Sequence, residues 1–384
     1  MHLPAVETLK RTIRKQRQVA NRPIPLPRDR TEIEIPPQYQ HTSAGEQFLQ
    51  HDSGADDVDR IMMFATARTL DILSNAEHIY MDGTFKIVPE LFFQLYTIHA
   101  LGPGGFFVPC LYALLPNKSR EMYNRLFNQM KTLRPNMMPR TIMIDFERAT
   151  LQAVTDAFPT ATVNGCFYHL RQNILRKIQS EGLQVQYQTN RDVKLQAWMI
   201  AAIAFVPLAN VENAFESLQD TALNELEPIF NYFEDTYIGR PRRRNGRCNP
   251  MFPHSMWNMH GRVEEDLPRT NNHVEGWHRK MNTAMGACNP TIWKFLDFLI
   301  KEQGLTDIKL NHAQGGHEAP KQRRAYQDTS RHLAVVVHDF VNRPIIDYLR
   351  GIAYNFHLWG TWSEMCSILL FILYYKDQSI DQMS

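Results

Sequence analysis

Three acidic residues, Asp82, Asp145 and Glu275, stand out because of the elements expected to carry them. Asp82 lies in the middle of the strand-like run HIYMDGTFKI, where strand propensity disfavours aspartate. Asp145 ends the apolar run TIMI, where a strand gives way to a helix, a frequent position for ligand sites in open α/β sheets. Three carboxylates without a dedicated cage suit Mg²⁺ or Mn²⁺, and two such ions support phosphodiester chemistry. The set indicates a nuclease or a strand-transfer enzyme, provided that the fold brings the acids together.

Each acid also has an ordinary structural interpretation. Asp82 can be a surface acid, and Asp145 can cap a helix, a contribution of about 1 kcal/mol. Glu275 lies in PRTNNHVEGWHRKMN, three residues after Asn272, which is the spacing of a capping box, and it can pair with Arg279 one turn later. The residues alone leave these alternatives open.

The elements expected to position the acids follow the order βββαβαβα between about residues 77 and 180. In the first strand Ile79, Met81, Phe85 and Ile87 share one face, and Asp82 lies on the other, which we expect to be exposed. A further helix is expected from residue 60 to residue 73. The expected strands are HIYMDGTFKI, LFFQLYTIHAL, FFVPCLYALL, RTIMID and TATVNGCFYH, and the helices are SREMYNRLFNQMKTL, FERATLQAVTDAF and LRQNILRKIQ. An antiparallel meander followed by alternating helices and strands predicts an α/β fold with a mixed sheet.

Shifts in composition divide the chain into five regions. They are a basic N-terminal segment and Pro-rich linker (1–60), the α/β core (61–180), a helical insertion with a basic loop (181–260), a helix completing the core (261–310) and a C-terminal helical region with an apolar tail (311–384).

The 384 residues are 43% hydrophobic and 21% charged, which is typical of a globular protein and excludes a fibrous or wholly disordered chain. The net charge of +2 means that any basic surface must be local. Eight Lys or Arg side chains lie between Lys10 and Arg30, against one acid, and a second basic cluster lies in the loop GRPRRRNGR. A solvated helix and a phosphate-contacting segment are both open for the N-terminal run.

Single, widely spaced cysteines argue against a secreted disulfide framework and favour a reducing compartment. They are Cys110, Cys166, Cys248, Cys288 and Cys366. No run reaches the roughly 20 apolar residues that a membrane helix needs, so no membrane partner is expected. The uncharged run from Met365 to Tyr375 is better explained as a buried segment or a tail that contacts a partner.

Four motifs on this frame, MDGTF, MIDFERA, GCFYHL and RTNNHVEGWH, closely resemble those of Mutator-like element (MULE) transposases over about residues 60 to 300. The resemblance implies an RNase H-like core of the DDE type, with a helical insertion before the third acid. It also implies that Asp82, Asp145 and Glu275 are the catalytic acids and hold two Mg²⁺ or Mn²⁺ ions. Glu147 is an alternative near the second acid, and weaker alternatives to the third are Glu264, Glu265 and Asp266.

The activity implied is cleavage of one strand at a transposon end, followed by joining of the freed 3′-hydroxyl to target DNA. The expected partner is double-stranded DNA, and the expected state is a homo-oligomer in the nucleus. Seven side chains are expected at the DNA interface: Arg240, Arg242, Arg243, Arg244, Arg247, His278 and Arg279. Two rivals are a domesticated DNA-binding or regulatory protein without catalysis and a metal-dependent nuclease.

Cys166 and His169 match the family's CxxH motif. A structural zinc needs four ligands, and no second convincing pair accompanies them, so zinc is not expected there. The alternative is a buried Cys166 and a His169 that begins a helix near the active site. Trp277 is expected in the core, because it shares one helical face with Val274 and Met281.

Some animal members of the family carry a FLYWCH-type zinc finger before the catalytic region. The opening MHLPAVETLK resembles the sequence that follows such a finger, with His2 as its last ligand. Trp257 and Asn258 in MWNMHGR also resemble family positions.

Overall fold

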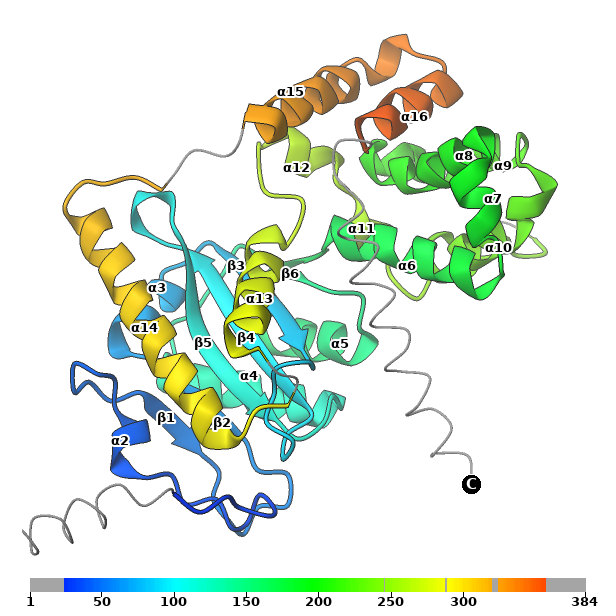
Figure 1. Cartoon of the computed structure of the whole chain (residues 1–384). Coiled ribbons are helices and arrows are strands. Elements are labelled where there is room, and N and C mark those ends of the chain that lie inside the picture. Colours follow the sequence, from blue (N-terminus) through cyan, green and yellow to red (C-terminus); the bar gives the residue numbers. More distant parts are fainter. Residues whose placement is uncertain (1–23, 245, 287–288, 320–323, 357–384) are drawn as a thin grey trace, which may run out of the picture.

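The computed structural model describes residues 24–244, 246–286, 289–319 and 324–356 (Figure 1). Most of the basic N-terminal run, His2 and the apolar run 365–375 lie outside the described residues. Within them, one seven-stranded mixed sheet has the order β1-β2-β5-β4-β3-β6-β7. Its strands are β1 (Leu49–Asp52), β2 (Met62–Phe64), β3 (His78–Thr84), β4 (Gln94–Leu101), β5 (Phe107–Leu115), β6 (Thr141–Ile144) and β7 (Thr162–Gly165).

The centre of the sheet confirms the predicted meander, since β3, β4 and β5 pair antiparallel in chain order. Strand β6 pairs parallel with β3, with Tyr80 opposite Met143, and β7 pairs parallel with β6. Continuing that register by two residues brings Asp82 level with Asp145. The sheet therefore sets the first two acids side by side.

Strands β1 and β2, at one side of the sheet, were not predicted. Strand β1 lies in the region expected to be a linker, and β2 lies where a helix was expected from residue 60. Helix α3 (Ala67–Ser74) begins only after Thr66, whose side chain accepts a hydrogen bond from the Thr69 N–H. The first half of that helix prediction is wrong, because the fully buried run 62–64 completes the sheet beside β5.

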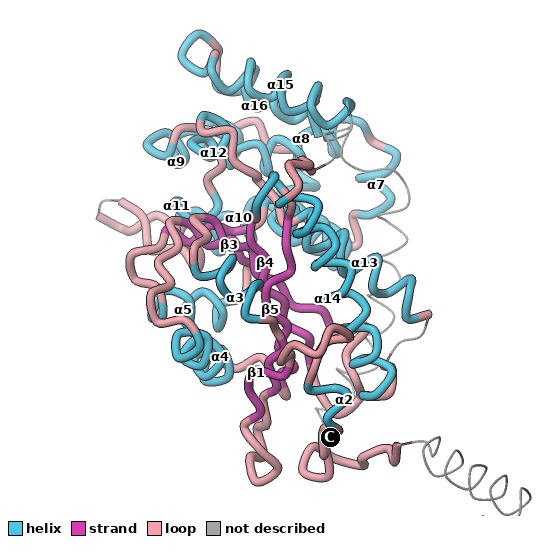
Figure 2. The backbone as a smooth tube through the Cα atoms, turned by 90° about the vertical axis from the view of Figure 1, so that its left-hand side faces the viewer, coloured by secondary structure: helices cyan, strands magenta, loops and turns pink. Residues whose placement is uncertain are grey.

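Helices cover both faces of the sheet (Figures 1 and 2). Helices α3, α4 (Arg120–Leu133) and α5 (Arg148–Ala157) pack on one face, and α13 (Asn272–Met285) and α14 (Ile292–Gln314) pack on the other. Strand β3 is consequently buried on both sides, and Asp82 is only 5% exposed. The expectation of an exposed face around Asp82 is wrong, because α13 lies across it.

Most of the described residues between β7 and α13 are helical. These helices are α6 (Phe167–Ser180), α7 (Gln184–Thr189), α8 (Arg191–Ala202), α9 (Val211–Gln219), α10 (Glu227–Phe233), the π-helix η5 (Glu234–Ile238), α11 (His254–Trp257) and α12 (His260–Glu264). Helices α15 (Arg324–His338) and α16 (Ile345–Tyr354) pack on α12 and α8 (Figure 1). The Tyr348 hydroxyl donates to the Phe205 carbonyl, so the described C-terminal helices join the insertion rather than the sheet.

The remaining short elements are the helix α2 (Pro37–Gln40) and the 3₁₀ turns η1 (Pro103–Gly105), η2 (Ile203–Phe205), η3 (Leu208–Asn210), η4 (Asn224–Leu226) and η6 (Phe340–Asn342). Among the described helices, none combines the length and apolar character needed to cross a membrane.

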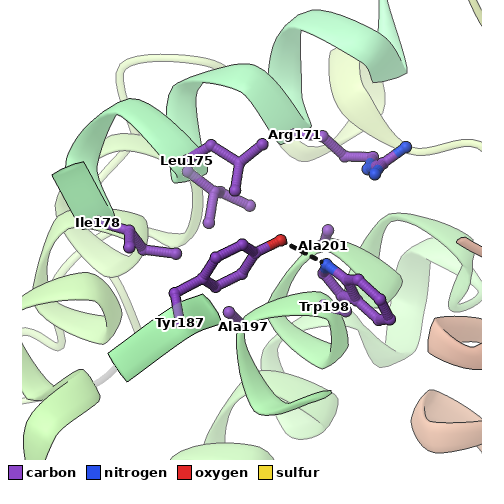
Figure 3. A pocket seen from close by; sticks show the side chains of 8 residues that line it. Arg171, Leu175, Ile178, Tyr187, Ala197, Trp198 and Ala201 are labelled. Atoms are coloured by element: carbon purple, nitrogen blue, oxygen red, sulfur yellow. Dashed lines mark hydrogen bonds between the residues drawn. The ribbon is translucent and has the colours of Figure 1, made fainter. Parts of the chain in front are cut away.

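A small cavity lies between α6, α7 and α8 (Figure 3). The Trp198 indole N–H donates to the Tyr187 hydroxyl at 2.8 Å beside it. Its wall is mostly apolar, with Arg171 at one side and no acidic side chain. The cavity therefore lacks the carboxylates that a magnesium or manganese site requires.

Candidate active site

Three side chains from three different elements converge at one end of the sheet. Ligand atoms of Asp82 on β3, His169 on α6 and Glu275 on α13 all lie within 4.8 Å of one another. His169 Nε2 is 3.0 Å from Glu275 Oε1. The fold thus joins the predicted first and third acids, and it adds the histidine of the CxxH motif between them.

Asp145 lies directly after β6 and outside that group of three, but it belongs to the same electrostatic environment. Burial raises the pKa of the Asp145 carboxyl to about 7; the charge of His169 lowers this pKa, and the neighbouring Asp82 and Glu147 carboxylates raise it. The residue at the N-cap of α5 is Glu147, so the interpretation of Asp145 as a helix cap is wrong. Its elevated pKa is instead typical of acids crowded into a functional site.

Glu275 lies in the first turn of α13, whose N-cap residue is Asn271. No side chain caps this helix start, so the capping box expected from Asn272 and Glu275 is absent. Burial raises the pKa of the Glu275 carboxyl, but the hydrogen bond and charge of His169, together with the charge of His278, hold this pKa below its usual value. The charge of Arg279 acts in the same direction.

His169 is held between the acids. Burial disfavours its protonated form, yet the neighbouring Cys166, Glu275 and Asp82 outweigh burial and raise the pKa of His169 well above its usual value. The carboxylate of Glu275 is therefore stabilised by a cationic partner when no metal ion is bound.

His278 supports Asp82 from the other side. Its Nδ1 lies 3.5 Å from Asp82 Oδ2, and its Nε2 lies 3.0 Å from the Thr97 hydroxyl. His278 is 5% exposed and faces the protein interior, so it does not lie at the expected DNA interface. The sequence offered one signal for this role, since His278 follows Glu275 by three residues, almost one helical turn.

The alternative acids do not join the group. The Tyr123 hydroxyl donates to Glu147 Oε2 at 3.0 Å, and burial raises the pKa of Glu147. Glu264, Glu265 and Asp266 are exposed, and Glu265 pairs with Arg140 at 2.8 Å. Glu275 is thus the only one of the proposed third acids that lies near Asp82.

The two residues of the CxxH motif have different partners. Cys166 is fully buried, and its sulfur accepts a hydrogen bond from the Asn271 N–H at 3.2 Å. His169 contacts Glu275, and Cys166 also lies close enough to raise the pKa of His169. The donor group found in the described part of the chain contains His169 but not Cys166.

The basic loop divides into two sets of arginines. Arg240 pairs with Glu234 at 2.8 Å, and Arg247 pairs with Glu234 at 2.8 Å and with Glu216 at 2.7 Å. These ion pairs belong to the insertion itself. Exposed side chains remain at Arg242, Arg243 and Arg244, and Arg279 is exposed on α13.

The two tryptophan regions lie in the interior. Val274, Trp277 and Met281 are buried together, which confirms Trp277 as a core residue. Trp257 is fully buried in the insertion, and the Asn258 side chain donates to the Val206 carbonyl at 2.7 Å.

The donor chemistry of the site fits a divalent cation. Two carboxylates and one imidazole converge, and a third carboxylate with a raised pKa lies beside them. Carboxylates suit Mg²⁺ and Mn²⁺, and imidazole is accepted by transition metals. A cation would offset the burial and the carboxylate repulsion that raise the pKa of Asp145.

Part of this site lies within a match to a known family. Residues 78–173 match the MULE transposase domain model, a span that includes Asp82, Asp145, Cys166 and His169. No curated protein matches the chain. The mixed sheet and this match confirm the predicted RNase H-like α/β fold. From β3 into α6, the chain is similar to the MULE transposase domain.

Proposed function

We propose that this protein cleaves DNA and transfers the cut strand, using two Mg²⁺ or Mn²⁺ ions held by Asp82, Asp145 and Glu275. The observation that carries the proposal is the convergence of Asp82, His169 and Glu275 within 4.8 Å, with two of the three inside the transposase domain match. The three residues come from segments that are far apart in the sequence, and the stability of the fold alone does not require them to converge.

Each side chain of the site has its own role in this proposal. Asp82 and Glu275 supply carboxylate oxygens, and Asp145 adds a third carboxylate whose proton is easily displaced near neutral pH, because its pKa is about 7. His169 holds the Glu275 carboxylate, and His278 supports Asp82. When bound, the ions would activate the attacking oxygen and stabilise the leaving oxygen of an in-line displacement.

Double-stranded DNA, as transposon ends and as target, is the proposed substrate. Arg242, Arg243, Arg244 and Arg279 are exposed and free to contact phosphates, which would provide affinity with little sequence discrimination. By analogy with the family, we further propose a homo-oligomer that acts in the nucleus.

The test is to incubate the purified protein with labelled duplex DNA at low salt, in Mg²⁺, Mn²⁺ or EDTA, with Asp145→Asn as the control. Cleavage that needs metal and is absent in the variant would support the proposal. Cleavage without joining, given an excess of target DNA, would favour the nuclease. Binding without cleavage by a folded protein would favour the domesticated DNA-binding protein.

A further inference from the structure

The connector that leads from the insertion into α13 lies along the end of β7. Arg262 Nη1 donates to Asn164 Oδ1 at 2.8 Å, while its Nε donates to the Pro268 carbonyl at 2.8 Å. The Phe167 N–H donates to the Arg269 carbonyl at 3.1 Å. The connector is therefore fixed to the β7 to α6 junction before α13 begins.

Asn271, at the N-cap of α13, joins three elements at once. Its backbone N–H donates to Cys166 Sγ at 3.2 Å, and its side-chain Nδ2 donates to the Met81 carbonyl at 3.1 Å. Its own carbonyl accepts from the Glu275 N–H at 2.9 Å. Met81 directly precedes Asp82, so one residue connects the strand of the first acid, the CxxH segment and the helix turn of the third acid.

The spacing of the CxxH motif matches the spacing on α13. Cys166 and His169 are three residues apart and lie about one turn apart at the start of α6. Their partners Asn271 and Glu275 are four residues apart and lie one turn apart at the start of α13. Cys166 contacts Asn271, and one turn later on both helices His169 contacts Glu275. These two contacts fix the start of α6 relative to the start of α13.

We infer that Asn271 and Cys166 are positioning residues that hold Glu275 at its distance from Asp82. This inference rests on the proposed function and names the residues that keep its site assembled. It gives the cysteine of the CxxH motif a role as a hydrogen-bond acceptor that docks α13, in place of metal ligation.

Stability alone explains this arrangement poorly. Asn271 is 1% exposed, and its Oδ1 has no hydrogen-bond partner among the described residues. A buried polar atom without a partner is unfavourable, and a thiol sulfur is a weak acceptor. The surroundings are apolar, with Tyr80, Met143 and Val274 in the same cluster as Cys166. Apolar side chains would pack there as well, whereas directional hydrogen bonds also fix the register of the helix start.

The test compares Asn271→Ala, Cys166→Ala and Cys166→Ser in the full chain. Mn²⁺ affinity is measured by electron paramagnetic resonance of the free ion, alongside cleavage kinetics and zinc content. We expect Asn271→Ala and Cys166→Ala to weaken Mn²⁺ binding by about 10- to 100-fold and to lower kcat while KM for DNA stays unchanged. Cys166→Ser should recover most of the affinity, because a hydroxyl also accepts the Asn271 N–H.

Matched controls exist outside the site. Asn258 makes the same amide-to-carbonyl hydrogen bond within the insertion, and Cys110 is a fully buried thiol on β5. Asn258→Ala and Cys110→Ala should lower the melting temperature without changing Mn²⁺ affinity. A general loss of packing would instead affect binding in the controls and the site variants alike.

Three outcomes would overturn the inference: wild-type Mn²⁺ affinity in Asn271→Ala, equal losses in Cys166→Ser and Cys166→Ala, or about one zinc per chain that disappears in both Cys166 variants. A wild-type protein that binds no Mn²⁺ would contradict the proposed function instead. Hydrogen exchange at the start of α13 then decides the inference alone. Faster exchange there in Asn271→Ala than in Asn258→Ala supports positioning, and equal exchange contradicts it.

Discussion

His169 Nε2 lies 3.0 Å from Glu275 Oε1, and this contact joins the CxxH segment on α6 to the acid on α13. It spans the helical insertion, because α6 begins before the insertion and α13 follows it. Glu275 therefore reaches Asp82 only when both ends of the insertion are docked against the sheet. The histidine links completion of the fold to assembly of the site.

Substituting His169 should disable the site without unfolding the protein. We expect His169→Ala to weaken Mn²⁺ binding by about 10- to 100-fold, because partners of metal-binding carboxylates typically contribute that much. The change is measured by titrating Mn²⁺ and by metal-dependent cleavage. His254→Ala is the control, since that ring also makes a polar contact, with the Ile238 carbonyl at 3.1 Å. Equal Mn²⁺ affinity in wild type and His169→Ala would remove His169 from the site.

Glu275 and Glu265 can be separated by one pair of variants. Glu275→Gln should lower metal-dependent cleavage by about 100-fold or more, because several kcal/mol of charge stabilisation depend on the ion held there. Glu265→Gln should leave cleavage near the wild-type rate, because Glu265 is exposed and pairs with Arg140. Gel-shift binding to duplex DNA is measured for both to show that binding persists. Comparable losses in the two variants would contradict the assignment of the third acid.

Local sequence patterns predicted the strands and helices of the core better than they predicted which helices cover the sheet. Alternation around Met81 located β3, and the acid after TIMI located the end of β6, since both depend on neighbouring residues alone. The burial of Asp82 could not be predicted, because the helix that covers it lies almost two hundred residues later in the chain. Strand β2 was missed for the same reason, because its three residues form a strand through their pairing with β5 and β1.

The sequence singled out the acids of the candidate site but not the residues that hold them in place. Asp82, Asp145 and Glu275 stood out by residue type and motif, whereas Asn271 and His278 are polar residues whose partners are set by tertiary contacts. In the basic loop, charge alone could not separate Arg247, which is paired with Glu234, from the exposed Arg243.

The raised pKa of Asp145 predicts a pH dependence of stability for the metal-free protein. An acid whose pKa rises from 3.8 to about 7 on folding stabilises the fold only while it is protonated. The free energy of unfolding should therefore contain a contribution that falls as pH rises from about 4 to about 7, by up to about 1.4 kcal/mol per pH unit. Urea unfolding in EDTA measures this, with Asp145→Asn as the comparison. The variant should gain stability relative to wild type at pH 8 and not at pH 4; a constant difference would contradict the shift.

The exposed and paired arginines of the basic loop should behave differently. Charge reversal at Arg242, Arg243 and Arg244 should weaken DNA binding and reduce the slope of log K against log salt by up to about three, one for each lost phosphate contact. Arg247→Ala should leave that slope unchanged and lower the melting temperature, because it removes a partner of the buried Glu234. Binding isotherms at several salt concentrations and thermal unfolding measure the two effects. An unchanged slope in the triple variant would remove this loop from the DNA interface.

Gly165 and Phe146 provide a test of how the insertion supports Asp145. A methyl group at Gly165 would lie 2.4 Å from Phe146 Cζ. The Phe146 ring packs edge-on against two other rings, with 5.5 Å between its centroid and that of Tyr237 and 5.2 Å to that of Phe252. The ring has little room to move, so Gly165→Ala should displace Phe146 together with the adjoining Asp145. We expect a stability loss of about 1–3 kcal/mol and a fall in cleavage of up to about 100-fold. Gly261→Ala is the control, because nothing lies within 4 Å of the added methyl group. Normal cleavage by a folded Gly165→Ala protein would show that Asp145 is placed independently of the insertion.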